Sequence, residues 1–232
     1  MGSYRNNLLQ SIACTIADYR QGEIEPITSE HVDKWLKQFD IQDQMTILIE
    51  LDLMLKRFYF SQAKVKECYR NFLAKEVVGD RSSVEALTDT EFLLIQEKGE
   101  SQKELWNAMD EVVTEKYHLS LNLWQALRDY SKVSPQTYIY IDDAIYTGNR
   151  VLYDLTEGPY LEGAPSAVAW IPREAPEECN LVVYTLASHA VGYEYISPLI
   201  KFWADKKRIS VRYCYDLQID NRRSEDSKAE CL

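Results

Sequence analysis

Two adjacent acids followed by a glycine turn are the residues of this chain best suited to chemistry. Residues 138–150 read YIYIDDAIYTGNR, a β-forming run followed by Asp142 and Asp143 and then by Thr147 and Gly148. Ligands bind at the carboxyl ends of parallel strands, where the backbone N–H groups of a turn that opens a helix can hold a phosphate. Two carboxylates at this place can accept hydrogen bonds from both hydroxyls of a ribose and can help to hold magnesium through water.

This segment resembles the PRPP-binding signature of type I phosphoribosyltransferases: a hydrophobic strand, two acids, two hydrophobic residues, any residue, and then Thr or Ser with Gly. The resemblance implies that Asp142 and Asp143 are the catalytic acids, contacting the ribose hydroxyls and Mg²⁺. It also implies that the 5′-phosphate is held by the loop residues Tyr146, Thr147, Gly148, Asn149 and Arg150.

Two departures from the family pattern bear on the substrate. Asn149 and Arg150 stand where the family continues with Gly, Lys or Ser and then Thr. Tyr146 occupies the position at which members acting on 6-oxopurines carry an acidic general base. These departures argue against 6-oxopurine salvage.

A second loop, about 45 residues upstream, follows an earlier apolar run at Phe92–Gln96. In the resembled family, such a loop binds diphosphate. The residues implied for this diphosphate loop are Lys98, Gly99, Glu100 and Ser101. Lys98 offers a cation and Gly99 permits close backbone approach, although an ordinary strand-to-helix turn would look the same.

The elements that must position these residues alternate between strand and helix from about residue 84 onward. The β-forming runs are 92–96, 137–141, 181–186 and 209–213, and the expected helices are 103–116 and 195–206. This alternation predicts an α/β fold with a mostly parallel sheet, as a phosphoribosyltransferase-like domain requires.

The first 75 residues are predicted to form four short helices, with Thr28 or Ser29 capping the second. A small β-element at residues 58–60 would make this a helical, winged-helix-like module. A turn-rich joint at residues 78–83 separates it from the rest. The expected domains are therefore 1–80 (helical module), 81–220 (phosphoribosyltransferase-like domain) and 221–232 (flexible tail).

Charge and cysteine usage restrict the kinds of partner and the cellular compartment that we expect for this chain. The formal net charge is −11, while residues 1–75 hold 10 basic and 10 acidic residues. Tight binding to nucleic acid by this chain alone is not expected, because that affinity depends on phosphate neutralisation. Five scattered cysteines predict free thiols, and the chain lacks a membrane-spanning run or a signal peptide, so we expect a cytoplasmic location.

The whole layout resembles phosphoribosyltransferase-like proteins with an N-terminal winged-helix-like region, found in prokaryotic conflict (anti-phage) systems. The segments that support this resemblance are 17–20, 28–39, 97–101 and 142–148. It implies a defence effector that binds a PRPP- or nucleotide-like ligand with Mg²⁺, has a protein partner, and acts on a nucleotide or nucleic acid when triggered. A nucleic acid would be reached only through that complex.

Several alternatives stay open. The pocket could transfer a phosphoribosyl group, hydrolyse a glycosidic bond, serve a PRPP-sensing regulator, or be vestigial in a non-catalytic subunit of a larger assembly. His189, after the third strand, is a candidate pocket residue, whereas a Ser188–His189 dyad is disfavoured because adjacent residues point in different directions. Residues 206–208 form a small basic cluster at a helix end.

Overall fold

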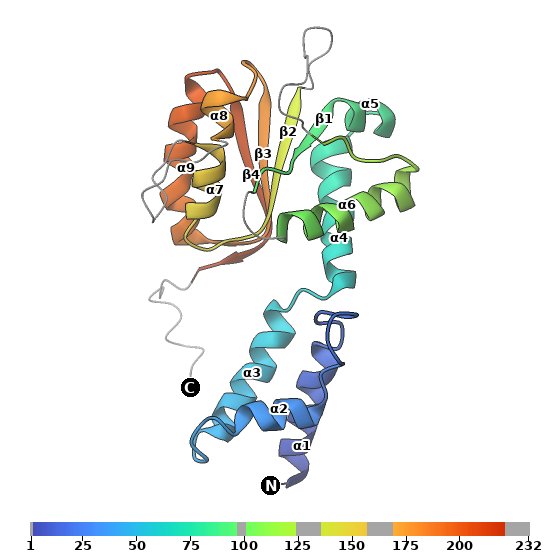
Figure 1. Cartoon of the computed structure of the whole chain (residues 1–232), viewed down its shortest axis with the longest axis vertical. Coiled ribbons are helices and arrows are strands. Elements are labelled where there is room, and N and C mark those ends of the chain that lie inside the picture. Colours follow the sequence, from blue (N-terminus) through green and yellow to red (C-terminus); the bar gives the residue numbers. More distant parts are fainter. Residues whose placement is uncertain (1, 97–100, 124–135, 157–168, 221–232) are drawn as a thin grey trace. The chain divides into compact units, whose positions relative to one another are not determined.

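The computed structural model describes residues 2–96, 101–123, 136–156 and 169–220 (Figure 1). The chain divides into two compact units, unit 1 (Met1–Glu67) and unit 2 (Cys68–Leu232). The elements in chain order are α1 (Gly2–Thr15), α2 (Ser29–Leu36), α3 (Gln44–Phe58), α4 (Gln62–Phe72), the π-helix η1 (Leu73–Val78), α5 (Ser83–Thr88), β1 (Thr90–Leu93), α6 (Ser101–Tyr117), β2 (Thr137–Ile145), α7 (Asn149–Leu155), α8 (Trp170–Arg173), β3 (Asn180–His189), α9 (Ala190–Asp205) and β4 (Ser210–Ile219).

Unit 1 is a helical module, as predicted. Its core is formed by apolar faces of α1, α2 and α3, which bury Leu8, Ile12, Val32, Leu36 and Leu48. These residues recur at helical spacing, so each helix presents one apolar stripe to its neighbours. The helices expected over the first 75 residues are therefore present.

The second helix begins at a capping box, which explains why α2 starts at Ser29. The backbone N–H of His31 donates to Oγ1 of Thr28 at 3.4 Å, and Nδ1 of His31 accepts from the backbone N–H of Thr28 at 3.2 Å. Of the two predicted caps, Thr28 is the one used. Such a cap satisfies backbone donors that the first helical turn leaves unpaired.

The β-element predicted at residues 58–60 is wrong. α3 continues to Phe58, and the backbone N–H of Tyr59 still donates to the carbonyl of Leu55 at 2.9 Å, which closes the helix. The hydroxyl of Tyr59 then donates to Asp18 at 2.8 Å, fixing the chain as it leaves α3. Residues 2–67 contain no strand, so the helical module lacks the wing that this segment was expected to supply.

The predicted joint at residues 78–83 lies inside unit 2, because the end of α4 already packs on the sheet. The rings of Tyr69 and Phe72 lie 5.9 Å and 4.0 Å from the ring of Tyr184 on β3. The two units meet within α4, between Glu67 and Cys68, about a dozen residues before the boundary expected from turn residues alone.

Unit 2 has an α/β fold built on a parallel sheet. The strand order is β1-β2-β3-β4, and each neighbouring pair is parallel. Helices α7, α8 and α9 cover one face of the sheet, and α4 and α6 lie on the other (Figure 1). On the α7–α9 side, the core includes Tyr138, Tyr140, Trp170, Val183 and Ile196. The predicted α/β fold with a parallel sheet is confirmed.

The strand order reverses beside β1. Phe92 on β1 pairs with Ile139 of β2 and also forms a parallel bridge to Leu123, which follows α6. Because one residue pairs with two partners across opposite edges, Leu123 lies on the side of β1 away from β2. After β1, the chain thus passes first to the edge of β1 that carries Leu123 and then to β2 at the opposite edge. Such a switch point opens a ligand crevice at the carboxyl ends of the two strands.

Two further expectations concern the thiols and the membrane. Within the described residues, Cys14, Cys68, Cys179 and Cys214 are free thiols, as predicted. None of the helices in this part of the chain is long and apolar enough to cross a membrane. At the basic cluster, Arg208 forms ion pairs with Glu177 and Glu178 of the loop between α8 and β3, at 3.0 Å and 2.8 Å.

Candidate functional site

The two adjacent acids lie at the carboxyl end of β2, at the switch point. Asp142 is 5% exposed, whereas Asp143 is exposed to solvent. The backbone N–H of Asp143 donates to Oδ1 of Asp142 at 2.9 Å, and the backbone N–H of Ala144 donates to Oδ1 of Asp143 at 2.7 Å. Each carboxylate is therefore oriented by the next peptide of the strand, which fixes both acids at the sheet edge.

The ionisation of Asp142 is strongly perturbed. Burial raises the pKa of Asp142 to about 7, and the negative charge of Asp143 adds to the rise. Hydrogen bonds from the backbone of Asp143 and from the side chain of Gln96 oppose it. A carboxyl group that titrates near neutral pH in a crevice is typical of functional sites, and a nearby cation or hydroxyl donors would favour its charged form.

A buried chain of hydrogen bonds leads away from Asp142. The amide of Gln96, which also bonds to Asp142, donates to the hydroxyl of Tyr140 at 3.3 Å. That hydroxyl donates to Oδ2 of Asp154 on α7 at 2.7 Å. Burial and the charges of Asp142 and Asp154 raise the pKa of Tyr140, so its phenol remains a donor. The end of β1 is thereby linked through β2 to the helix behind the candidate loop.

Gln102, in the first turn of α6, joins the carboxyl ends of β1 and β2. Its side chain is buried, and its Oε1 accepts from the backbone N–H groups of Ile95 at 2.8 Å and Gln96 at 3.0 Å. Its Nε2 donates to the carbonyl of Ile141 at 3.0 Å. Sequence reasoning missed both glutamines. The only local signal was an uncharged polar side chain at each end of a charged, glycine-containing loop.

The candidate phosphate loop turns sharply between β2 and α7. Gly148 has φ +78°, a left-handed conformation that disfavours other residues, and it precedes the first residue of α7. Tyr146 and Thr147 are exposed, and Asn149 and Arg150 are half-buried at the start of α7. The five predicted loop residues are contiguous with the acids at the same sheet edge.

Two glycines allow this loop to lie against α9. A Cβ at Gly148 would come within 2.2 Å of Ile196. A Cβ at Gly192 would come within 2.2 Å of the carbonyl oxygen of Tyr146. Both distances are far below ordinary contact, so each position requires glycine. Gly192 was missed from the sequence, where the only signal was a glycine in the first turn of the helix after the third strand.

His189, a candidate pocket residue, ends β3 directly before α9. Its ring lies 5.5 Å from the ring of Tyr146, beside the candidate loop. The neighbouring Ser188 hydroxyl is buried and has no hydrogen-bond partner within the described residues, so the Ser–His dyad is not formed. The hydroxyl of Thr185, which pairs in register with Asp142, is likewise buried without a partner there.

The candidate diphosphate loop falls largely outside the described residues. Lys98, Gly99 and Glu100 lie there, and Ser101 is described as the first residue of α6. The described ends of the segment, Gln96 and Gln102, are bonded to each other and to β2. Both ends of the predicted loop are thus anchored at the switch point, next to Asp142.

The donor set of the site fits a magnesium ion that is shared with a ligand. Among the described residues, no group of three or more His, Cys, Asp or Glu could hold a metal by itself. Asp142 and Asp143 supply two neighbouring oxygen donors whose mutual repulsion a cation would relieve. Magnesium is commonly bound through one or two carboxylates, waters and substrate phosphates, which matches this pair.

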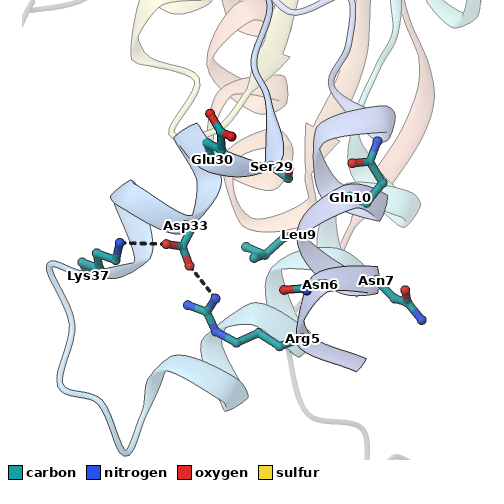
Figure 2. Close-up of a pocket in the computed structure, with 9 residues that line it drawn as sticks. All are labelled: Arg5, Asn6, Asn7, Leu9, Gln10, Ser29, Glu30, Asp33 and Lys37. Atoms are coloured by element: carbon teal, nitrogen blue, oxygen red, sulfur yellow. Dashed lines mark ion pairs between the residues drawn. The ribbon is translucent and has the colours of Figure 1, made fainter. Parts of the chain in front are cut away.

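A cavity in unit 1 offers different chemistry. It has a volume of about 700 Å³ and lies between α1 and α2 (Figure 2). Three of its charged groups form ion pairs, because Asp33 lies 2.5 Å from Arg5 and 2.9 Å from Lys37. Those bonds, above all the one from Lys37, hold the pKa of Asp33 below its usual value. The pKa of Asp33 thus moves in the direction opposite to that of Asp142, so this cavity lacks an acid that titrates near neutral pH.

Comparison with known proteins places these features in a family. A family model described as PRTase-CE matches residues 32–232. No curated protein and no solved structure matches the chain. The matched segment includes all four strands, both acids, the glycine turn and the larger part of unit 1.

Proposed function

The chain belongs to the PRTase-CE family of phosphoribosyltransferase-like domains, and from this premise we propose that it binds a PRPP- or nucleotide-like ligand at the carboxyl ends of β1 and β2. The observation that supports this most is Asp142, a buried acid titrating near neutral pH beside a second acid at the switch point. The two carboxylates would accept hydrogen bonds from ribose hydroxyls. The loop 146–150 would hold the ribose phosphate, and the segment 98–101 would face the diphosphate.

Magnesium is the proposed cofactor. Asp142 and Asp143 would hold it together with oxygens of the ligand. When bound, it would neutralise charge on the diphosphate and so make that group a better leaving group. The chain itself would orient the ribose through the two acids and position the phosphate through the backbone of the glycine turn.

We further propose that the chain is an effector of a bacterial defence system, located in the cytoplasm, with a protein partner. In this proposal, it acts on a nucleotide or nucleic acid when triggered and reaches nucleic acid only within that complex. Tyr146 in place of an acid, together with Asn149 and Arg150 in the turn, disfavours routine base salvage. Arg150 supplies a cation suited to a longer polyphosphate or a backbone phosphate.

Calorimetry with PRPP and Mg²⁺ tests the binding proposal directly. We expect saturable binding by the wild type and none by Asp142→Asn combined with Asp143→Asn. Asp205→Asn is the matched control, since Asp205 is an exposed acid at the end of α9 that pairs with Lys201. Equal binding by the double variant and the control would refute the assignment of the acids.

A second candidate function is a non-catalytic subunit or a PRPP-sensing regulator. The altered turn, Asn149 and Arg150, favours this alternative. Measurements of diphosphate release with each common base, with nucleotides and with nucleic acid distinguish the two candidate functions. Binding without release by the complete complex would favour sensing, whereas release lost in Asp142→Ala would favour an enzyme. Robust turnover of adenine, guanine or orotate by the isolated chain would contradict the effector proposal.

A further inference from the structure

A row of exposed apolar side chains follows one side of α9. Its members are Val191, Tyr195, Leu199 and Phe202, and their exposed fractions lie between 40% and 59%. Steps of four, four and three residues place them within an arc of about 80° along roughly 16 Å of helix. Elsewhere in the described part of unit 2, large exposed hydrophobic residues occur singly, at Val84, Tyr146 and Tyr215.

The apolar row is complementary to the same row on a second α9 that runs in the opposite direction. If a second α9 lies antiparallel across it, Val191 meets Phe202 of the second copy and Tyr195 meets Leu199. Each aromatic side chain then faces an aliphatic one, and both pairs occur twice. Contacts that repeat in this way are the signature of an interface built on a two-fold axis.

The charges beside the row are complementary in the same arrangement. Glu194 and Lys201 lie about 20° apart on one flank of α9, from the helical repeat. In an antiparallel pair, the same flank of each helix meets, so Glu194 of one copy faces Lys201 of the other. Lys201 also pairs with Asp205 of its own helix at 2.9 Å. Antiparallel packing also aligns the helix dipoles favourably.

We propose that this side of α9 is the surface on which a second copy of the chain docks, with the two-fold axis passing near Pro198. The occupant is a second copy because both the apolar row and its flanking charges are complementary to their own reversed order. Val191, at one end of the row, neighbours Gly192, whose backbone lies against Tyr146. The dimer would therefore place its interface beside the candidate ligand site of each copy.

Sedimentation velocity of the full chain over a range of concentrations measures the association. We expect a reversible dimer with a dissociation constant on the order of micromolar, since one helix face contributes a small interface. Leu199→Glu should weaken dimerisation at least tenfold, because it buries a charge at the centre of the row. Val84→Glu, at another exposed apolar residue, on α5, should leave it unchanged.

A wild type that remains monomeric up to about 100 μM would overturn the proposal. So would a Leu199→Glu variant that dimerises like the wild type.

The charge pairing has its own test. Glu194→Lys and Lys201→Glu should each weaken the dimer by opposing like charges across the axis. The double exchange Glu194→Lys with Lys201→Glu restores opposite charges and should recover the wild-type association. Circular dichroism of each variant checks that the overall helix content is unchanged. If the double exchange associates no better than the single variants, the antiparallel arrangement is wrong.

Discussion

The carboxyl group of Asp142 couples the candidate site to the stability of the fold. Its pKa is about 7 in the folded chain and 3.8 in an unperturbed chain, so the folded state binds the proton more tightly. Stability from this group is fully present below the lower value and is lost as pH rises toward the higher one. The folded protein therefore tolerates the ionised acid poorly, as expected for a group that a bound cation or ligand would neutralise.

Replacing this acid should remove that pH dependence. Asn at position 142 resembles the protonated acid, so between pH 5 and pH 8 the wild type should lose up to about 3 kcal/mol of unfolding free energy relative to Asp142→Asn. Urea denaturation of both proteins at the two pH values measures the difference, and the other titrating groups cancel in the comparison. Parallel pH profiles would show that Asp142 is already ionised at pH 5.

Gly192 offers a second test at single-residue scale. Alanine there would place a Cβ 2.2 Å from the carbonyl oxygen of Tyr146, so we expect a loss of about 1–3 kcal/mol and weaker ligand binding. Gly2→Ala is the matched control, because Gly2 is also helical and has no atom within 4 Å of the added Cβ. Alanine should be neutral or slightly stabilising at Gly2. A similar gain at Gly192, measured by thermal unfolding, would contradict the close approach.

At the scale of elements, the ends of β1 and β2 are joined by one buried side chain. Gln102→Leu keeps much of the volume but leaves the amides of Ile95 and Gln96 and the carbonyl of Ile141 without their partner. Each unsatisfied buried group costs about 1–3 kcal/mol, so the variant should be strongly destabilised. Hydrogen exchange should quicken first at Ile95 and Gln96. Lys103→Leu, at the exposed neighbour, should leave both the stability and this exchange unchanged.

The order and type of these elements could be predicted, because apolar runs and helical periodicity are local properties. The strand expected at 137–141 in fact continues to Ile145, since β3 supplies partners as far as Ser188. That pairing, which places both acids within the strand, depends on a segment 43 residues away and has no local signal. The predicted strand at 58–60 failed for the opposite reason: its aromatic residues favour strands, but the helix before them continues.

The residues of the candidate site could be predicted where they belong to one short sequence motif. They could not be predicted where elements distant in the sequence meet. Asp142, Asp143 and Gly148 belong to one contiguous motif, so their order, two acids near the end of a strand and then a glycine turn, could be predicted from the sequence. Gln102 and Gly192 act across the sheet edge, on β2 and on the loop before α7. Their roles appear only once the topology is known.

The family match begins at Val32, inside unit 1, and runs to the end of unit 2. The family match therefore includes the greater part of the helical module in addition to the sheet. Residues 1–75 carry equal numbers of acidic and basic residues, which gives them no electrostatic basis for holding duplex DNA. They do present an apolar groove of about 380 Å³ beside the exposed ring of Trp35.

We therefore expect unit 1 to contact a protein through apolar surface and not to bind DNA. A tagged full chain expressed in its native host should retain its partner at roughly 0.5 M salt, because apolar contacts are not screened as charges are. Trp35→Glu should abolish retention, whereas Ile41→Glu, at another exposed apolar residue of the same unit, should not. Fluorescence anisotropy with duplex DNA should show no binding at physiological salt. If DNA binds with an affinity that falls steeply with salt and is unaffected by Trp35→Glu, unit 1 instead has a phosphate-binding surface. If both variants lose the partner equally, the groove is not the contact site.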